Sequence, residues 1–413
     1  MQRYILDNNK NTNVDDFQVR DGLIQKIKSR FHTYGYKQVR TSTFESYDMY
    51  SDVAGTVNRE EMIKVIDSSG HVLVLRPDVT IPLTRTTALN LSVPNSYQRL
   101  FYVLDVFRQS EEQVNQKEST QAGVECFGEN SPEVDAELIM LSIHTLKDLG
   151  FNNFKIEIGH AGFFKELIKQ TKLSHQELDV LLSYVQSKNI AEMTPYLQKL
   201  SIDEKVQSAI VSIPLLYGKP DEVIKQAKSI ILNKKMEEIL QNLTDVFSIL
   251  QDFGVEDAVN FNFGLINNMD YYSGVIFQGF VDSIGKPVLM GGRYDHLSEQ
   301  FGHSLPAIGF AFEVDLLIHA LIQQGLTTNQ SKPIDFTIQY TKQKQKEALH
   351  LAYQLRDKGY TVLIDTKAAA LNNSGASCVI RYEETQNTVK IDNKEQVFSN
   401  SIELLSLIEK GDT

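Results

Sequence analysis

The chain has 413 residues, of which 42% are hydrophobic, and its formal net charge is −12. This size and composition predict a globular protein of two or three domains, and the acidic balance weighs against a nucleic-acid binder, which needs a concentrated basic surface. The two cysteines lack CxxC or metal-site spacing, and the sequence shows no signal-peptide pattern. No apolar run approaches the ~20 residues of a membrane span. These features predict a cytoplasmic protein without a metal site or membrane anchor.

The first predicted element is a helix over residues 15–34, where apolar residues recur at helical spacing and Gly35 follows as a stop. Short strand-like runs then extend to residue 128, and the turn residues between them predict one antiparallel sheet of meanders and hairpins. These runs are KQVRTSTF, MIKVID, HVLVLR, QRLFYVLDVFR and TQAGVECFG. Residues 131–150, which begin with Ser-Pro and end with glycine, predict a second helix.

The region from about 161 to 253 is almost entirely helical in pattern. A capping box joins a serine at the N-cap to a glutamate three residues later through reciprocal hydrogen bonds. We predict such boxes at Ser174 with Glu177 and at Ser201 with Glu204.

Strand character returns from 257 to 290, and the sequence GGRYDHLSEQFG is predicted to break it. PAIGFAFEVDLLIHALIQQ then predicts a strand or turn that leads into a helix. After a polar linker, strands and helices alternate over residues 333–413 and predict a small α/β domain. The fold class is therefore α+β, with a first domain over 1–325 that holds a helical insertion at about 161–253.

Four segments place polar residues inside otherwise apolar strands. Asp78 and Thr80 lie in the first, LVLRPDVTIPLTR. This segment taken alone slightly favours a turn at a strand end with solvated charges. Arg108 ends the second, RLFYVLDVFRQ. An arginine at a strand end can be merely exposed, but its planar fork also suits a carboxylate or a phosphate.

The third segment, TQAGVECFG, spaces Gln121, Gly123 and Glu125 two residues apart, so they share one face of a strand. Gly123 leaves space above the sheet between the two polar side chains. A glutamate and a glutamine beside such a gap can bind an ammonium group and a polar side chain. The alternative is a hydrated sheet face with a glycine at a bulge.

The fourth segment, LINNMDYYSGVIF, contains two adjacent tyrosines, each an apolar ring with a hydroxyl at its tip. On a strand, Asp270 and Tyr272 would share one face and Tyr271 would point the other way. One of the two tyrosines is therefore expected in the core.

Six motifs occur in an order that carries a family resemblance: LRPDVT, RLFYVLDVFR, TQAGVE, MDYYSG, GGRYD and PAIGFAF. Over about residues 1–320 the chain resembles histidyl-tRNA synthetases, and more closely the synthetase-like regulatory subunits of ATP phosphoribosyltransferase. This resemblance implies a class II aminoacyl-tRNA synthetase-like antiparallel sheet flanked by helices, a helical insertion and a dimer. Residues 333–413 would be a degenerate anticodon-binding domain, since they carry ten Lys or Arg against eleven Asp or Glu.

The chain departs from the synthetase motifs at the residues that would serve ATP. Asn267 and Asn268 stand in place of a catalytic arginine and a glycine. Glu313 and Leu316 replace a glycine and a phosphate-gripping arginine. Ser119 replaces a phenylalanine that stacks on adenine. Adenylation needs cations and donors around the α-phosphate, so these departures imply that ligase activity is lost.

The amino-acid side of the synthetase pocket is retained. By resemblance, the histidine site comprises Asp78, Thr80, Arg108, Gln121, Glu125, Tyr271 and Tyr272. Glu125 and Asp78 would serve the ammonium group. Gln121 and Thr80 would add hydrogen bonds, and the two tyrosines would hold the imidazole.

The hypothesis that follows is a non-catalytic subunit that binds the separate, short-form catalytic subunit of ATP phosphoribosyltransferase and reports histidine to it. The resemblance implies a homodimer within a hetero-oligomer, with no cofactor and no nucleic acid. Two alternatives remain open: a diverged histidyl-tRNA synthetase, and a stand-alone histidine-binding sensor with another partner.

Overall fold

The computed structural model describes residues 14–50, 57–90, 97–109, 117–266, 271–326, 334–365, 378–391, 394–400, 403–404 and 406–407. The chain divides into two compact units, residues 1–327 and 328–413, and each is described by itself. Asn267, Asn268 and Asp270, which the sequence analysis singled out, lie outside the described residues. None of the described helices is long and apolar enough to cross a membrane.

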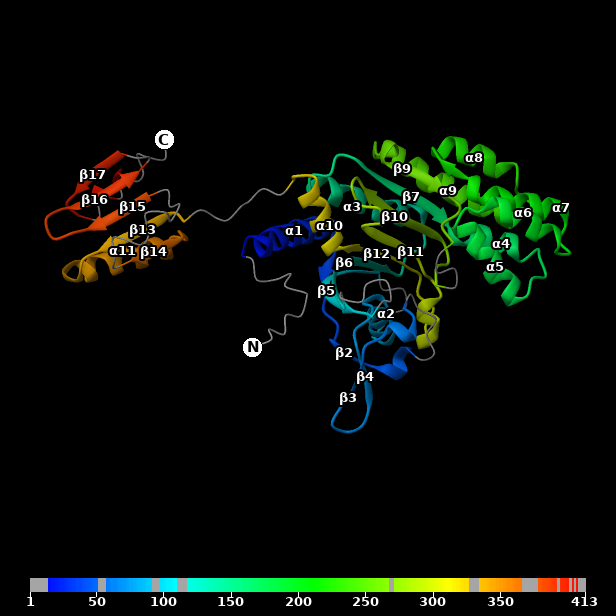
Figure 1. The fold of residues 1–413 in the computed structure, drawn as a ribbon, viewed down its shortest axis with the longest axis horizontal. Coiled ribbons are helices and arrows are strands. Elements are labelled where there is room, and N and C mark those ends of the chain that lie inside the picture. The colour runs from blue at the N-terminus through cyan, green and yellow to red at the C-terminus, as the bar shows by residue number, and fades with distance from the viewer. Residues whose placement is uncertain are drawn as a thin grey trace, which may run out of the picture. The chain divides into compact units, whose positions relative to one another are not determined.

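The first unit is built on a nine-stranded sheet in the order β1-β5-β6-β12-β11-β10-β7-β9-β8 (Figure 1). Its strands are β1 (Lys37–Gln38), β5 (Gln98–Phe107), β6 (Glu118–Phe127), β7 (Phe154–His160), β8 (Tyr217–Gly218), β9 (Val259–Asn262), β10 (Val275–Val281), β11 (Leu289–Arg293) and β12 (Ala307–Glu313). In the sheet order from β5 to β7, every neighbouring pair is antiparallel. β1 pairs in parallel with β5, and β9 pairs in parallel with β7. The predicted α+β class with a large antiparallel sheet is confirmed.

Three of the early strands form a separate sheet in the order β2-β4-β3: β2 (Phe44–Ser46), β3 (Lys64–Ile66) and β4 (Val72–Leu75). The prediction of one sheet for all the early runs is therefore wrong. Alternation of side chains identifies a strand but not its partner. The predicted break is also misplaced, because β11 continues through the first three residues of GGRYDHLSEQFG to Arg293.

Helices cover one face of the large sheet. They include α1 (Val14–Thr33), α3 (Pro132–Asp148) and α10 (Val314–Gln323), whose buried residues share one core cluster with the sheet and with the helical insertion. The predicted first helix is confirmed: Leu23, Ile27 and Phe31 are buried, and Gly35, with φ +79°, follows its end. Another helix, α2 (Thr80–Leu89), contributes Ile81 and Leu83 to a second core cluster.

The predicted helical insertion is present and gathers beside the β7–β9 side of the sheet (Figure 1). It comprises α4 (Ala161–Ile168), α5 (His175–Gln186), α6 (Ile190–Gln198), α7 (Glu204–Ser212), α8 (Pro220–Lys228) and α9 (Lys234–Asp252). The capping box of Ser174 and Glu177 has both of its hydrogen bonds. The second predicted box is wrong, because α7 begins at Glu204 itself and Asp203 caps it by accepting the Lys205 N–H at 2.8 Å.

The second unit has a five-stranded sheet in the order β14-β13-β15-β16-β17. Its elements are β13 (Phe336–Tyr340), α11 (Gln345–Asp357), β14 (Val362–Asp365), β15 (Cys378–Tyr382), β16 (Asn387–Ile391) and β17 (Lys394–Phe398). β13 pairs in parallel with both β14 and β15. β16 pairs antiparallel with β15 and with β17. Buried Leu351 and Leu355 of α11 belong to the core cluster of this unit.

The two faces of β6 have opposite characters. Ala122, Val124 and Cys126 belong to the cluster beneath the helices. Gln121 and Glu125 alternate with them and therefore project to the other face, beside the second cluster, which includes residues of α2 and five tyrosines. The predicted shared face of Gln121 and Glu125 is thus present in the folded chain, and it is the face away from α3.

A buried ion pair ties β11 to α3. Arg293 donates to Asp135 Oδ1 from Nε at 2.9 Å and from Nη2 at 2.5 Å, and their side chains are 4% and 3% exposed. Arg293 also donates to Asp295, which accepts a hydrogen bond from the Ser273 hydroxyl at 3.1 Å. Gly274 lies against the aliphatic part of Arg293, where a Cβ would come within 2.9 Å of Cδ. This network fixes the chain just after the two tyrosines.

We predict that Asp135→Ala lowers the free energy of unfolding by about 3–5 kcal/mol, because it leaves the Arg293 charge buried without its main partner. Asp148→Ala, on the same helix, is the matched control. Asp148 pairs with Arg30 at 2.6 Å, but these side chains are 34% and 28% exposed, and an exposed pair contributes about 1 kcal/mol or less. Urea denaturation of both variants measures the difference, and equal losses would contradict this account.

Candidate ligand-binding site

A cavity of about 170 Å³ opens on the face of the sheet that carries Gln121 and Glu125. All seven residues of the predicted site line it: Asp78, Thr80, Arg108, Gln121, Glu125, Tyr271 and Tyr272. They come from β6, from the start of α2, from the residue after β5 and from the chain before β10. Pockets for drug-sized ligands enclose roughly 300–1,000 Å³. The space therefore suits a smaller molecule, such as an amino acid.

Glu125 is the most deeply buried carboxylate of the cavity, with 2% of its surface exposed. Its Oε1 accepts the Thr80 hydroxyl at 2.6 Å, and its Oε2 accepts the Tyr294 hydroxyl. Burial raises the pKa of Glu125 to about 8, although both hydrogen bonds oppose that rise. Because burial disfavours the charged form of Glu125, this carboxyl ionises more readily when a cation approaches it.

Asp78 and Thr80 are positioned by the start of α2. Val79 at the N-cap makes no side-chain cap, and instead Asp78 Oδ1 accepts the backbone N–H of Ile81 at 2.7 Å. This bond satisfies one of the free donors of the first helical turn and fixes the Asp78 side chain. The simpler interpretation of this segment as a solvated turn is wrong, because Asp78 is only 6% exposed.

Gln121 and Glu313 meet at the other end of the cavity. They are paired residues of the neighbouring strands β6 and β12, and Gln121 Nε2 donates to Glu313 Oε1 at 2.7 Å. Burial raises the pKa of Glu313, while the Gln121 hydrogen bond and the charge of Arg108 lower it. Four residues along a strand span about 13 Å, so the Glu125 and Gln121 ends form two separate polar regions.

Aromatic side chains form the walls between these ends. The ring of Tyr102 lies over Gly123, where a Cβ would come within 2.5 Å of it, so the expected space above this glycine is filled. Tyr271 contacts Tyr272 edge to face, with centroids 4.9 Å apart, and stacks on Tyr294 at 5.4 Å. Both predicted tyrosines line the cavity.

The expectation that Tyr271 points away from the site is therefore wrong. Its premise was a strand through residues 270–272, but β10 begins only at Val275. In the turn before a strand, successive side chains need not alternate between faces. Lys165 of α4 donates to the Tyr272 carbonyl at 2.8 Å, which also links this turn to the helical insertion.

Sequence reasoning missed the three further lining residues that carry a hydroxyl or carboxylate group: Tyr102, Tyr294 and Glu313. Tyr102 lies in an apolar strand run and carries no local signal of a site. Tyr294 belongs to GGRYD, which was recognised as a motif, but its partner Glu125 becomes apparent only from the fold. Glu313 was noted as a departure from the synthetase pattern, and strand register brings it to Gln121.

The other positions linked to ATP carry no cationic group. Ser119 lies on β6 opposite Val106 of β5, and Leu316 of α10 packs against the large core cluster. Neither side chain can neutralise a phosphate. Together with an acid at Glu313, these residues offer no cationic replacement for the contacts a synthetase makes to ATP.

Gly309 leaves room for Glu125. The two residues are paired across β12 and β6, and a Cβ on Gly309 would lie 1.8 Å from Glu125 Oε2 and 2.6 Å from the Val124 carbonyl oxygen. Because a backbone atom is one of these neighbours, a side-chain rotation alone cannot relieve the clash.

We predict that Gly309→Ala lowers the free energy of unfolding by about 1–3 kcal/mol through overpacking and displaces Glu125 from Tyr294. Gly22→Ala is the control, since Gly22 lies within α1 with nothing within 4 Å of an added Cβ. That change is expected to leave stability equal or raise it by up to ~1 kcal/mol. Thermal and urea unfolding of both variants test this, and a neutral Gly309→Ala would refute the close contact.

The raised pKa of Glu125 also predicts a pH dependence. Its ordinary value is 4.5, so between pH 4.5 and about 8 the folded chain holds a proton that the unfolded chain has released. The stability owed to this proton is complete below pH 4.5 and is lost as pH rises through 8. Glu125→Gln has no such titration. The melting temperature of the variant minus that of the wild type should therefore increase from pH 5 to pH 9, and a constant difference would contradict the raised pKa.

Comparison with known proteins adds an independent result. The histidyl-tRNA synthetase family profile matches residues 11–317. The chain is 46% identical to an ATP phosphoribosyltransferase regulatory subunit of Oceanobacillus iheyensis over 97% of this chain and 98% of that one. It is 34% identical to one of Ruminiclostridium cellulolyticum, over 83% and 81% of the two chains.

Solved structures agree in fold. A regulatory subunit/histidyl-tRNA synthetase from Bacillus halodurans matches with a TM-score of 0.78 and 27% identity, over 89% of this chain and 94% of that one. The histidyl-tRNA synthetase of Nostoc matches with a TM-score of 0.77 over 96% of both chains, and at 16% identity it supports the fold alone. The chain belongs to the family of ATP phosphoribosyltransferase regulatory subunits, which is related to the histidyl-tRNA synthetases.

Proposed function

We propose that this chain binds histidine in the cavity and reports it, as a non-catalytic cytoplasmic subunit, to a separate short-form catalytic subunit of ATP phosphoribosyltransferase. The activity controlled would be the first step of histidine biosynthesis. The observation that carries the proposal is the convergence of all seven predicted residues on one cavity of about 170 Å³. The names of the relatives support the partner, and the assembly would contain a homodimer of this chain.

The cavity offers chemistry for each part of histidine. Asp78 and Glu125 can neutralise an ammonium group, and Arg108 offers its guanidinium to a carboxylate. Tyr271, Tyr272 and Tyr294 can enclose an imidazole with ring faces and hydroxyl groups. The three tyrosines already contact one another, and Tyr294 donates to Glu125, so this part of the site needs little ordering when the ligand arrives.

Feedback requires that histidine bind one state of the assembly better than another. The two tyrosines lie in a turn that Lys165 joins to the helical insertion and that the Arg293 network joins to α3. A ligand that contacts this turn is therefore linked through it to the helical insertion and to α3.

Calorimetry on the full chain tests the proposal. We expect histidine to bind, ATP to show no comparable binding, and Asp78→Asn to weaken histidine binding about tenfold or more through loss of a charged partner. The asparagine retains an oxygen that can accept the Ile81 N–H. Added to the catalytic subunit, the chain should permit activity that histidine reduces.

Two results would favour the alternatives. Histidine-dependent pyrophosphate exchange with ATP would identify a diverged synthetase. Histidine binding without recovery of a catalytic subunit, either by co-purification or by mixing the two chains, would favour a stand-alone sensor. Absence of histidine binding by the wild type would overturn the proposed ligand.

A further inference from the structure

The charges lining the cavity are unbalanced. Among its described lining residues, the carboxylates of Asp78, Glu125 and Glu313 face the single cation of Arg108. Asp78 and Glu125 suit the cationic part of an amino acid. Glu313 has the wrong sign for a ligand carboxylate directed at Arg108. The presence of Glu313 near Arg108 is therefore not explained by binding of an amino acid alone.

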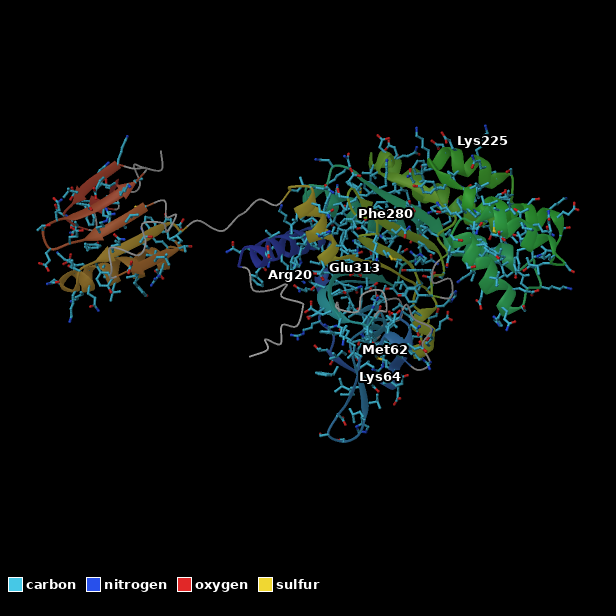
Figure 2. The ribbon with its side chains drawn as sticks, viewed as in Figure 1. Arg20, Met62, Lys64, Lys225, Phe280 and Glu313 are labelled. Carbon is cyan, nitrogen blue, oxygen red and sulfur yellow. The ribbon has the colours of Figure 1, made fainter. Side chains whose placement is uncertain are left out.

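The structure holds Glu313 at the Arg108 end. It is the last residue of β12, where the chain passes into α10, and Figure 2 labels it there. Its backbone N–H donates to the Val288 carbonyl at 2.9 Å, and its side chain accepts from Gln121 at 2.7 Å. Arg108 is close enough that its charge favours the ionised form of Glu313. Gln121, one of the two groups suited to receive a ligand carboxylate, is thus already engaged by a protein carboxylate, and the charge of the other, Arg108, already acts on it.

An adjacent network keeps Glu313 in place. Asp315, two residues later on α10, accepts from Arg20 of α1 at 2.6 Å and from the backbone N–H of Thr120 at 3.2 Å. Thr120 is the neighbour of Gln121 on β6. Glu313 is therefore held on both sides: Asp315 ties the start of α10 to Thr120, and the preceding residue, Phe312, pairs with Ala122 of β6.

We infer that Glu313 is a sensitivity-determining residue of this site: its carboxylate competes with that of a bound amino acid for Arg108 and Gln121, and so raises the ligand concentration needed to fill the cavity. The inference rests on the proposed function and adds to it. The site would bind histidine more weakly than its other contacts allow. It would also disfavour a ligand that extends a phosphate toward this end.

The test compares two ligands with two variants of the full chain. Glu313→Gln keeps an oxygen that can accept from Gln121 and removes the charge. We expect it to bind L-histidine about tenfold more tightly, since like charges a few ångströms apart in a partly buried site repel by roughly that factor. L-Histidinol carries a hydroxymethyl group in place of the carboxylate. Its affinity should stay unchanged or fall, because one attractive charge for its ammonium is lost.

Glu118→Gln is the matched control, since Glu118 is an exposed acid on β6 outside the cavity. It should change neither affinity, and thermal melting should find both variants folded. Histidine binding that is unchanged or weaker in Glu313→Gln, while the wild type binds histidine, would overturn the competition and leave the proposed ligand intact. Equal tightening of both ligands would overturn it as well.

Failure of the proposed function gives a different pattern. If neither the wild type nor Glu313→Gln binds histidine, the proposed ligand is wrong and the competition falls with it. If only Glu313→Gln binds, the competition is supported in its strongest form, with Glu313 closing the site to histidine in the isolated chain.

Discussion

The site depends on one buried carboxylate. Glu125 lies at the bottom of the cavity because Thr80 and Tyr294 donate to its two oxygens and because Gly309 leaves its position open. Burying an ionised group without partners is costly, so the surrounding elements must supply donors or let the group keep its proton. The start of α2, the end of β11 and the middle of β12 are all constrained by this side chain. Under the proposed function, the same side chain would pair with the ammonium group of the ligand.

The second polar region has a different origin. At the Gln121 end, Glu313 stands where the resemblance to synthetases implies glycine. On α10, Leu316 packs against the large core cluster where the resemblance implies arginine. The first replacement adds a negative charge to the cavity, and the second removes a cation. Under the proposed function, replacements of this kind would let a synthetase fold keep an amino-acid site without a site for ATP.

The sequence predicted much of this arrangement and failed for identifiable reasons. Spacing by two residues on β6 placed Gln121 and Glu125 on one face, because strand geometry is local. The same rule misplaced Tyr271, because the strand begins after it. Tyr102 and Tyr294 reach the cavity through pairing between distant strands, which a single sequence does not encode locally. The motif order supplied the family and the fold, and the register of β12 against β6 was needed to bring Glu313 to Gln121.

The contact between Gly309 and Glu125 also limits how such chains can diverge. An added Cβ at 309 would crowd both the Glu125 carboxylate and the Val124 carbonyl, so positions 309 and 125 are linked by steric exclusion rather than by attraction. A larger residue at 309 therefore requires a shift of the β6 backbone together with a displaced or shorter side chain at 125. Coordinated change at these two positions would indicate an altered pocket, and it can be read from sequence alone.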